Sequence, residues 1–213
     1  AGSENAVEFD APLRQDGRRS GTGGGTGRDG GGICYTTRMA RFLQFDAVSF
    51  AYPGMAAPLL SDVTAFFPEG GWTGIVGANG AGKTTLLKLA AGALAPTNGT
   101  IRQLGTACYA VQRTDAPPVG DFMNCWDAAA LDERRRLGVG EDWAERWDTL
   151  SHGERKRAQI ALALWRAPDV LALDEPTNHL DATGKAVLLD ALQHYHGAGL
   201  IAYVGGHEKA HRV

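Results

Sequence analysis

The sequence predicts an α/β fold in which a mainly parallel β-sheet is joined by an antiparallel β portion and a short helical subdomain. Three observations support this fold class. Between residues 72 and 204, helical patterns alternate with short apolar strands, which is typical of parallel sheets. Residues 41–67 carry strand patterns that favour antiparallel pairing. Residues 121–148 hold the charged helical stretches of the subdomain.

Composition divides the chain into two parts. The segment RRSGTGGGTGRDGGG, residues 18–32, has glycine at more than half of its positions and offers nothing for a core. We therefore expect residues 1–38 to be disordered. From Met39 the composition changes sharply, and 44% of the 213 residues are hydrophobic, which is enough for one domain with a core. We expect this domain to span residues 39–213. The alternative that its C-terminal end is incomplete stays open.

Charge, cysteine usage and hydropathy argue against several classes of protein. A formal net charge of −3 and a pI of about 6.1 give no overall attraction to nucleic acid. Three scattered cysteines without a CxxC pair indicate reduced thiols and a cytoplasmic location rather than a disulfide framework. No apolar run approaches the roughly 18 residues that a membrane-spanning helix needs. No histidine or cysteine cluster has the spacing of metal ligands.

The first predicted elements begin at Arg41. Apolar residues at Phe42, Phe45 and 48–50 predict strands that lead to a turn at residues 52–54, Tyr-Pro-Gly. The segment WTGIVGANGAGKTTLLKLAAGALAP then has the pattern of a strand, a glycine-rich loop and a helix. Leucines and alanines between residues 86 and 94 mark that helix, and we expect Pro96 to end it.

The remaining elements continue the alternation of helix and strand. Their expected ranges are helices at 127–138, 141–147 and 154–167, a strand at 170–173, a helix from about Asp181 to His194, and a strand at 200–204. The helix at 154–167 is basic at its start and apolar later, and Pro168 halts it.

A phosphate-binding loop of the pattern G-x(4)-G-K-[ST] lies between the predicted strand and helix. It consists of Gly77, Ala78, Asn79, Gly80, Ala81, Gly82, Lys83 and Thr84. Its glycines let backbone N–H groups turn toward phosphate oxygens, and the helix N-terminus adds a positive end. Lys83 would reach the β- and γ-phosphates of a nucleotide, and the Thr84 hydroxyl would bind Mg²⁺. The sheet is therefore expected to be of the P-loop NTPase type.

Two adjacent carboxylates, Asp174 and Glu175, follow the apolar run of the 170–173 strand. Burying them without a compensating charge is costly. Because strand ends with a phosphate loop and acidic residues share one edge of a parallel sheet, nucleotide-bound Mg²⁺ would supply that charge. Successive strand residues point to opposite faces, so Asp174 would hold the Mg²⁺ shell while Glu175 orients and deprotonates the attacking water. A solvated strand end with incidental acids is the alternative.

The segment LSHGERKR, residues 150–157, has two interpretations. Ser151 and Glu154 form a capping-box pattern, which by itself accounts for the start of a helix. Ser151, Gly153 and the unpaired N–H groups of a helix start also suit an anion. Since one phosphate loop is already present, a second anion site would indicate two phosphate-bearing faces, and both interpretations stay open.

Taken in order, GANGAGKTT, Gln112, LSHGE and LALDEPTNHLD resemble the ATP-binding cassette (ABC) ATPase family over about residues 41–207. The resemblance implies ATP hydrolysis, with ATP and Mg²⁺ as ligands. It also implies a second ABC domain as partner, in a head-to-tail dimer or a tandem pair. Ser151 and Gly153 would then contact the γ-phosphate bound by the opposing domain, and His152 replaces the usual glycine between them.

The same resemblance implies further site residues. Tyr52 would stack on adenine, Thr85 would bond the α-phosphate, and Gln112 would bind Mg²⁺ and sense the attacking water. Asp181 would contact the opposing subunit, and His207 is the candidate switch histidine. Plain alternatives stay open: a turn aromatic for Tyr52, a polar strand end for Gln112, a helix N-cap for Asp181 and a surface residue for His207.

The stretch DEPTNHLD is more similar to the ABC-F branch, which acts on ribosomes in translation or antibiotic protection, than to transporter subunits. The first reading is therefore an ABC-F-like ATPase. The alternatives are the ATP-hydrolysing subunit of a membrane permease and a fragment that binds nucleotide without hydrolysing it. ABC-F proteins usually carry two ABC domains, whereas this chain has one. The interval at residues 113–150 is also short for the family's helical subdomain, and two glycines precede His207.

Overall fold

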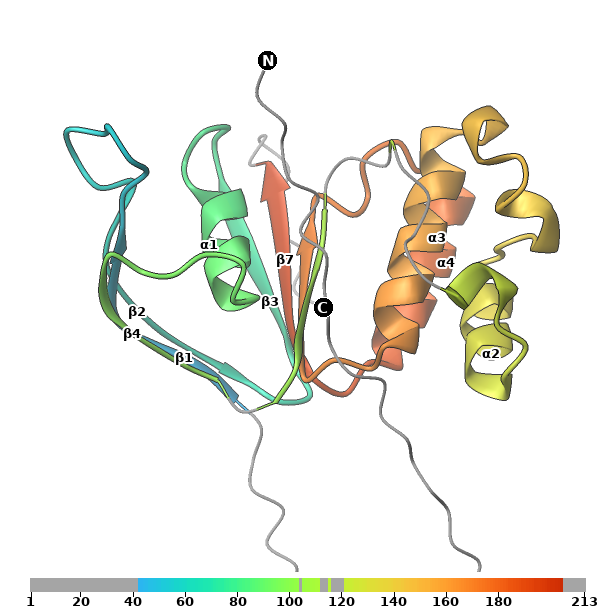
Figure 1. Cartoon of the computed structure of the whole chain (residues 1–213), viewed down its shortest axis with the longest axis horizontal. Helices are drawn as coiled ribbons and strands as arrows, with labels where there is room; N and C mark the ends of the chain where they lie inside the picture. The colour runs from blue at the N-terminus through green and yellow to red at the C-terminus, as the bar shows by residue number, and fades with distance from the viewer. Residues whose placement is uncertain (1–41, 104, 112–114, 116–120, 205–213) are drawn as a thin grey trace, which may run out of the picture. The chain divides into compact units, whose positions relative to one another are not determined.

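The computed structural model describes residues 42–103, 105–111, 115 and 121–204. This part of the chain has the predicted α/β architecture, with a parallel sheet, an antiparallel sheet and a small helical region (Figure 1). The expectation of disorder for residues 1–38 lies outside the described residues, as do Gln112 and His207. Among the described residues, no helix is both long enough and apolar enough to cross a membrane.

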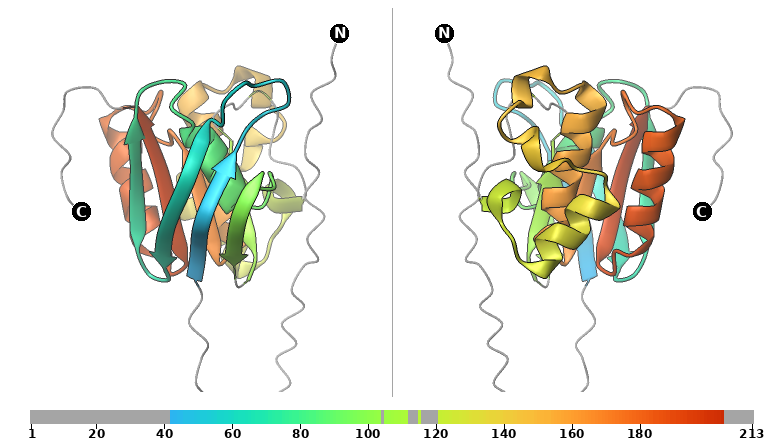
Figure 2. Two further views of the ribbon diagram at one scale, coloured as in Figure 1. Left: turned by 90° about the vertical axis from the view of Figure 1, so that its left-hand side faces the viewer. Right: turned by 90° about the vertical axis from the view of Figure 1, so that its right-hand side faces the viewer.

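The antiparallel sheet has the strand order β2-β1-β4 and faces the viewer in the left panel of Figure 2. Its strands are β1 (Phe42–Phe50), β2 (Leu60–Pro68) and β4 (Asn98–Gln103). Leu43 and Phe45 are fully buried, and a register shift after Phe45 returns Val48 to the same face. Ala47 lies within the shift at φ 50°. This bulge explains why the apolar spacing of β1 is not a strict alternation.

The second sheet is parallel throughout and has the order β3-β7-β6-β5. Its strands are β3 (Trp72–Gly77), β5 (Ala107–Ala110), β6 (Val170–Asp174) and β7 (Ala198–Val204). Every residue of β6 is buried, as expected for a short apolar strand with both faces covered. Its side chains divide between two cores: Val170 and Ala172 face one, Leu171 and Leu173 the other.

Helices cover both faces of the parallel sheet. They are α1 (Lys83–Ala90), α2 (Ala128–Arg136), α3 (His152–Trp165) and α4 (Ala182–Gln193). Helix α1 lies between the two sheets, whereas α3 and α4 lie on the opposite face with α2 outside them (Figures 1 and 2). One apolar core therefore joins α1 to both sheets, and the other joins the parallel sheet to the remaining helices. This layering brings the strand that precedes the phosphate loop and the strand that carries the acids into one sheet.

Some element boundaries differ from the sequence prediction. Helix α1 ends at Ala90 rather than at Pro96, because Gly92 takes a left-handed conformation at φ 72° just after the helix. The helix predicted at 141–147 is instead a pair of short 3₁₀ turns, η2 (Glu141–Trp143) and η3 (Trp147–Thr149). The short strands β4 and β5 were not predicted.

Arginine side chains hold the helical region together from within. Arg134 of α2 is only 4% exposed, and its guanidinium donates to the carbonyl oxygens of Met123 and Cys125. The same group lies over the rings of Phe122 and Trp126, at 5.9 and 5.6 Å from the centroids. A cation between aromatic faces and backbone acceptors keeps its charge satisfied in an apolar surrounding. Arg134 thus fixes the chain that leads into α2.

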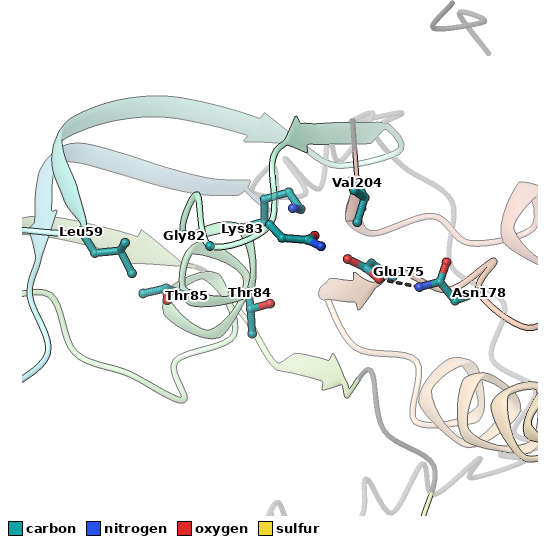
Figure 3. A pocket seen from close by; sticks show the side chains of 10 residues that line it. Leu59, Gly82, Lys83, Thr84, Thr85, Glu175, Asn178 and Val204 are labelled. Carbon is teal, nitrogen blue, oxygen red and sulfur yellow. Dashed lines mark hydrogen bonds between the residues drawn. The ribbon is translucent and has the colours of Figure 1, made fainter. Parts of the chain in front are cut away.

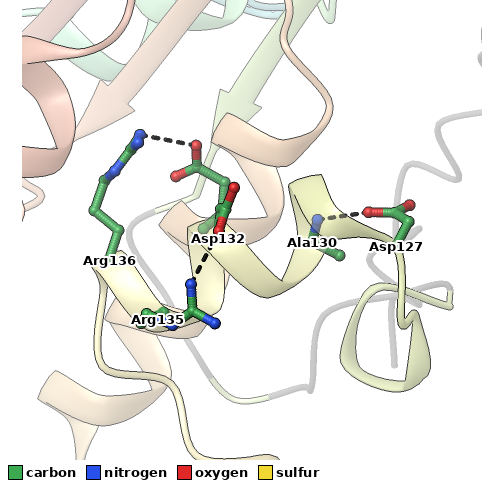
Figure 4. A network of polar contacts seen from close by, with 6 residues as sticks. Asp127, Ala130, Asp132, Arg135 and Arg136 are labelled. Atoms are coloured by element: carbon green, nitrogen blue, oxygen red, sulfur yellow. Dashed lines mark hydrogen bonds and ion pairs between the residues drawn. The ribbon is translucent and has the colours of Figure 1, made fainter.

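The outer surface of α2 shows weaker contacts (Figure 4). Asp127 caps the helix by accepting from the Ala130 N–H at 2.6 Å. Arg135 pairs with Asp132 at 3.1 Å, but the arginine side chain is 78% exposed. Exposed pairs of this kind contribute little to stability because solvent screens them.

We expect Arg134→Met to lower the free energy of unfolding by about 2–4 kcal/mol, since it leaves two buried carbonyls without a charged donor. Arg135→Met on the same helix is the matched control, and it should change stability by less than about 0.5 kcal/mol. Urea denaturation of both variants measures the difference. Equal and small losses would contradict the anchoring role of Arg134.

Candidate functional site

The phosphate loop connects β3 to α1, and its conformation requires glycine at two positions. Gly80 and Gly82 have φ values of 78° and 89°, in the left-handed region that other residues avoid. A Cβ atom at Gly82 would also lie 2.9 Å from Cδ2 of Leu60. These two glycines therefore bring the chain into the first turn of α1 at Lys83.

The Lys83 side chain folds back onto the loop that precedes α1. The side chain is 8% exposed, and its Nζ donates to the carbonyl oxygens of Gly77 and Ala78, each at 2.9 Å. A buried ammonium needs such acceptors or an anion. The loop therefore keeps a positive charge at the N-terminus of α1, where an anion is also favoured by the helix.

Asp174 joins three elements at the end of β6. Its carboxylate is almost completely buried, with 1% of the residue exposed. Oδ2 accepts hydrogen bonds from Thr84 Oγ1 of α1 at 2.7 Å and from the Tyr109 hydroxyl of β5 at 2.9 Å. Burial, and then the charge of Asp174, raise the pKa of Tyr109, so the phenol stays a neutral donor. Tyr109 was not singled out by the sequence.

Glu175 leaves the strand in a way that strand alternation does not describe. Strand β6 ends at Asp174, and Glu175 has a left-handed backbone at φ 47°. Alternation along one strand, the reason given from the sequence for separate roles, therefore does not apply to Glu175, and the separate roles stay a prediction. Its N–H donates to the Ala202 carbonyl at 3.1 Å, and its carboxylate accepts from the side-chain amide of Asn178. The carboxylate is thereby held outside the strand.

A pocket of about 560 Å³ lies between the phosphate loop and the residues that follow β6. In Figure 3, Lys83 and Thr84 lie on one side of it, and Glu175 and Asn178 lie on the other. The full lining consists of Leu59, Asn79, Gly80, Gly82, Lys83, Thr84, Thr85, Glu175, Asn178 and Val204. The cation and the carboxylate of the sequence prediction therefore share one cavity.

The donor set beside this pocket fits Mg²⁺. The Thr84 hydroxyl and the Asp174 carboxylate lie in direct contact at 2.7 Å. Both are hard oxygen donors, and one carries a charge, which is the chemistry that Mg²⁺ prefers over nitrogen or sulfur ligands.

Lys156 is a second buried cation at this strand end, and the sequence analysis did not single it out. It lies on α3, is 2% exposed, and donates from Nζ to the carbonyl oxygens of Val111 at 2.7 Å and Asp174 at 3.3 Å. Burial lowers the pKa of Lys156 to about 8, although the charges of Asp174 and Glu175 oppose that shift. Helical spacing with the buried Ile160 was the available signal that Lys156 faces inward.

Tyr52 lies beside the start of α1. Its hydroxyl is 3.1 Å from Thr85 Oγ1, and its ring packs edge-on against Phe50 at 4.9 Å. The side chain is 38% exposed. The structure thus brings Tyr52 and Thr85 together near the phosphate loop, while stacking on adenine and contact with the α-phosphate stay predictions.

The start of α3 shows the capping box that the sequence allowed. Ser151 Oγ accepts from the Glu154 N–H at 3.2 Å, and the Glu154 carboxylate accepts from the Ser151 N–H at 2.8 Å. Ser151 and His152 are exposed, and the His152 ring packs against that of His179 at 5.4 Å. A Cβ at Gly153 would lie 2.8 Å from the His179 carbonyl oxygen, which explains this glycine. A contact with a second nucleotide stays a prediction.

Three further predicted residues have a plain outcome. Asp181 is the N-cap of α4, with its carboxylate accepting from the Gly184 N–H at 2.7 Å, and contact with an opposing subunit is a prediction still. Gln112 and His207 lie outside the described residues, so their proposed roles stay predictions as well.

The geometry of the site agrees with a comparison to known families. The family model described as ABC transporter matches residues 60–178, which is more than half of the 213-residue chain. The chain belongs to the ABC ATPase family. Domains of this family bind ATP, normally with Mg²⁺, and work with a second ABC domain.

Several relatives have similar sequences. The chain is 34% identical over 170 residues to the probable ATP-binding protein YheS of Escherichia coli K12, covering 73% of this chain and 26% of YheS. It is 33% identical over 201 residues to the mycobactin import ATP-binding/permease protein IrtB of Mycobacterium tuberculosis, covering 80% and 34%. A putative ABC transporter ATP-binding protein of Nitratidesulfovibrio vulgaris is 32% identical over 179 residues, covering 70% and 66%. The chain thus spans about a quarter of YheS and a third of IrtB.

We expect Lys83→Ala to weaken ATP binding by about tenfold or more, because it removes the buried charge beside the phosphates. Lys88→Ala is the matched control: it removes a lysine from the same helix, and Lys88 does not line the pocket. The dissociation constant of ATP, measured by calorimetric titration, should stay within about twofold of the parent for Lys88→Ala. An unchanged affinity in Lys83→Ala would overturn the phosphate-loop assignment.

Proposed function

We propose that this ABC domain binds Mg²⁺–ATP and hydrolyses it in the cytoplasm, paired head-to-tail with a second ABC domain. The observation that carries the proposal is the shared pocket, in which Lys83 and Thr84 of α1 face Glu175 beyond β6. These residues come from distant parts of the sequence and supply a cation, a hydroxyl and a carboxylate around one cavity. The chemistry matches what phosphoryl transfer to water needs.

Binding is assigned to the loop and to the end of β6. The Lys83 ammonium would exchange its two carbonyl acceptors for β- and γ-phosphate oxygens, which are stronger acceptors because they are charged. Thr84 and Asp174 would hold Mg²⁺, which when bound neutralises phosphate charge. Tyr52 would stack on adenine, and Thr85 would bond the α-phosphate.

Hydrolysis is assigned to Glu175. Its carboxylate would orient a water molecule and accept a proton as the water oxygen bonds to the γ-phosphorus and the bond to the bridging oxygen breaks. The hydrogen bond from Asn178 holds the carboxylate in one orientation, which lowers the entropy that the reaction must lose. By resemblance to the family, Gln112 would contact Mg²⁺ and the water, and His207 would be the switch histidine.

Pairing is assigned to the start of α3. The exposed Ser151 and the adjoining Gly153 would contact the γ-phosphate bound by the opposing domain, and Asp181 would contact that domain directly. The support is that neither Ser151 nor Gly153 lines the pocket of its own domain, although both lie at a helix N-terminus. Within one chain, Ser151 and Glu154 already bond to each other in the capping box. The contact with the opposing γ-phosphate would be made in addition to those bonds.

The proposed setting is an ABC-F-like protein that acts on the ribosome, in translation or antibiotic protection. The residues in its favour are those of DEPTNHLD, with His179 exposed just before α4. Similarity to IrtB, whose name includes a permease, favours the alternative of a transporter subunit that docks on a membrane permease. A fragment that binds ATP without hydrolysing it is the third reading.

We predict that ATP turnover per molecule rises with protein concentration, since hydrolysis needs two domains, and that ribosomes raise it further. Steady-state phosphate release, measured over a range of protein concentrations with and without ribosomes, is the test. Turnover that ribosomes leave unchanged at every concentration would contradict the ribosomal setting and favour a transporter role.

Glu175→Gln and Asp174→Asn should separate the two carboxylates. Glu175→Gln keeps the shape but loses the base, so ATP should bind, hydrolysis should fall by about a thousandfold, and an ATP-bound dimer should accumulate. Asp174→Asn should instead weaken ATP binding in the presence of Mg²⁺ and leave binding in EDTA nearly unchanged.

Size-exclusion chromatography with Mg²⁺–ATP and a parallel turnover assay measure both effects. A monomeric Glu175→Gln that hydrolyses ATP at the parental rate would refute the assignment of the base. If the parent protein does not hydrolyse ATP and Glu175→Gln binds ATP as a monomer, the results would favour a fragment that binds ATP without hydrolysing it.

A further inference from the structure

Lys156 is a buried cation at the site for which the proposed mechanism has no use. It does not line the pocket, and its Nζ donates to the main-chain carbonyl oxygens of Val111 and of Asp174, the residue before the pocket-lining Glu175. Taking an ammonium out of water is unfavourable, and a methionine of similar volume would fill the same space without that cost. A residue that breaks the packing rule in this way is expected to serve a site.

The two carbonyls that Lys156 contacts occupy equivalent positions on neighbouring strands. The parallel pairing of β5 with β6 ends at Ala110 and Leu173. Val111 follows the last residue of β5 and Asp174 is the last residue of β6, and their carbonyl oxygens accept from Lys156 at 2.7 and 3.3 Å. The ammonium therefore bridges the strand ends at the point where their own pairing stops.

The bridge adjoins both carboxylates of the proposed mechanism. Asp174 is itself one of the two acceptors through its main chain, and Glu175 follows it with a left-handed backbone. Residues in that conformation persist only where the surroundings hold them. The Glu175 N–H and the Asn178 amide hold it from the side of β7 and the following loop, and Lys156 holds the chain from α3.

We propose that Lys156 is a positioning residue: its ammonium clamps the ends of β5 and β6 together and so fixes the main chain that carries Asp174 and Glu175. Its effect on turnover rests on the ATPase function proposed above, but the clamp itself does not. Because Lys156 belongs to α3, whose N-cap is Ser151, the clamp also ties the start of this helix to the strand ends.

The test compares Lys156→Met with Arg157→Met. Arg157 is the next residue of α3 and also donates to two carbonyls, those of Leu137 and Gly138, while lying over Trp143 at 5.1 Å. It is a matched control, because it ties the same helix to a loop far from the pocket in the sequence. Both variants lose a cation and its hydrogen bonds to main-chain carbonyls, so both should lose some thermal stability.

Hydrogen–deuterium exchange of the chain without nucleotide gives the first readout. In Lys156→Met, amides of residues 171–178, including the Glu175 N–H, should exchange about tenfold faster or more than in the parent. In Arg157→Met the faster exchange should appear in residues 137–143 instead, with 171–178 unchanged. Parental protection of residues 171–178 in Lys156→Met would overturn the clamp.

Steady-state kinetics gives the second readout. Lys156→Met should lower kcat by about tenfold or more while KM for Mg²⁺–ATP stays within about threefold, whereas Arg157→Met should change neither. A parental kcat would overturn the role in turnover. A parent that neither binds nor hydrolyses ATP would refute the proposed function, and the exchange result would still decide the clamp. If Lys156→Met does not fold, Lys156→Gln takes its place, and full parental exchange and kcat in that variant would overturn the proposal.

Discussion

The buried carboxylate of Asp174 is the constraint around which the site is built. It is taken out of water at the end of an apolar strand, so its hydrogen bonds must come from the protein. Thr84 supplies one from α1 and Tyr109 supplies another from β5, while Lys156 places a positive charge behind it. Three elements therefore converge on the end of β6, and the phosphate loop is brought to the same sheet edge with them.

This convergence connects folding to chemistry. The layered cores place α1 against one face of the parallel sheet and α3 against the other (Figure 1). Asp174 accordingly receives one hydrogen bond from Thr84 of α1 and one from Lys156 of α3. Hydrogen bonds keep the Lys83 ammonium and the Thr84 hydroxyl at the sheet edge where an anion and a metal would bind. The cost of burying two cations and a carboxylate at this edge is offset by the two surrounding cores, which consist mainly of apolar side chains.

Much of this could be predicted from the sequence, because the phosphate loop, β6 and the helix caps depend on local spacing. Lys83, Thr84, Asp174 and Glu175 meet as expected for strand ends in a parallel sheet. Tyr109 could not be found in this way, since it lies 65 residues from Asp174 and only tertiary packing brings the two together. Helical spacing indicates that Lys156 faces inward, but its contact with Asp174, 18 residues away, depends on tertiary packing. The left-handed backbone of Glu175 also lacks a local signal, because nothing in its side chain requires that conformation.

A crystal structure of the chain with Mg²⁺ and a non-hydrolysable ATP analogue tests most directly that Asp174 organises a Mg²⁺–ATP site. Lys83 Nζ should leave the carbonyls of Gly77 and Ala78 for the β- and γ-phosphates. Mg²⁺ should lie between the Thr84 hydroxyl and the Asp174 carboxylate, and the Tyr109 hydroxyl should still donate to Asp174. A nucleotide bound outside the pocket, or a metal bound away from Thr84 and Asp174, would contradict that account.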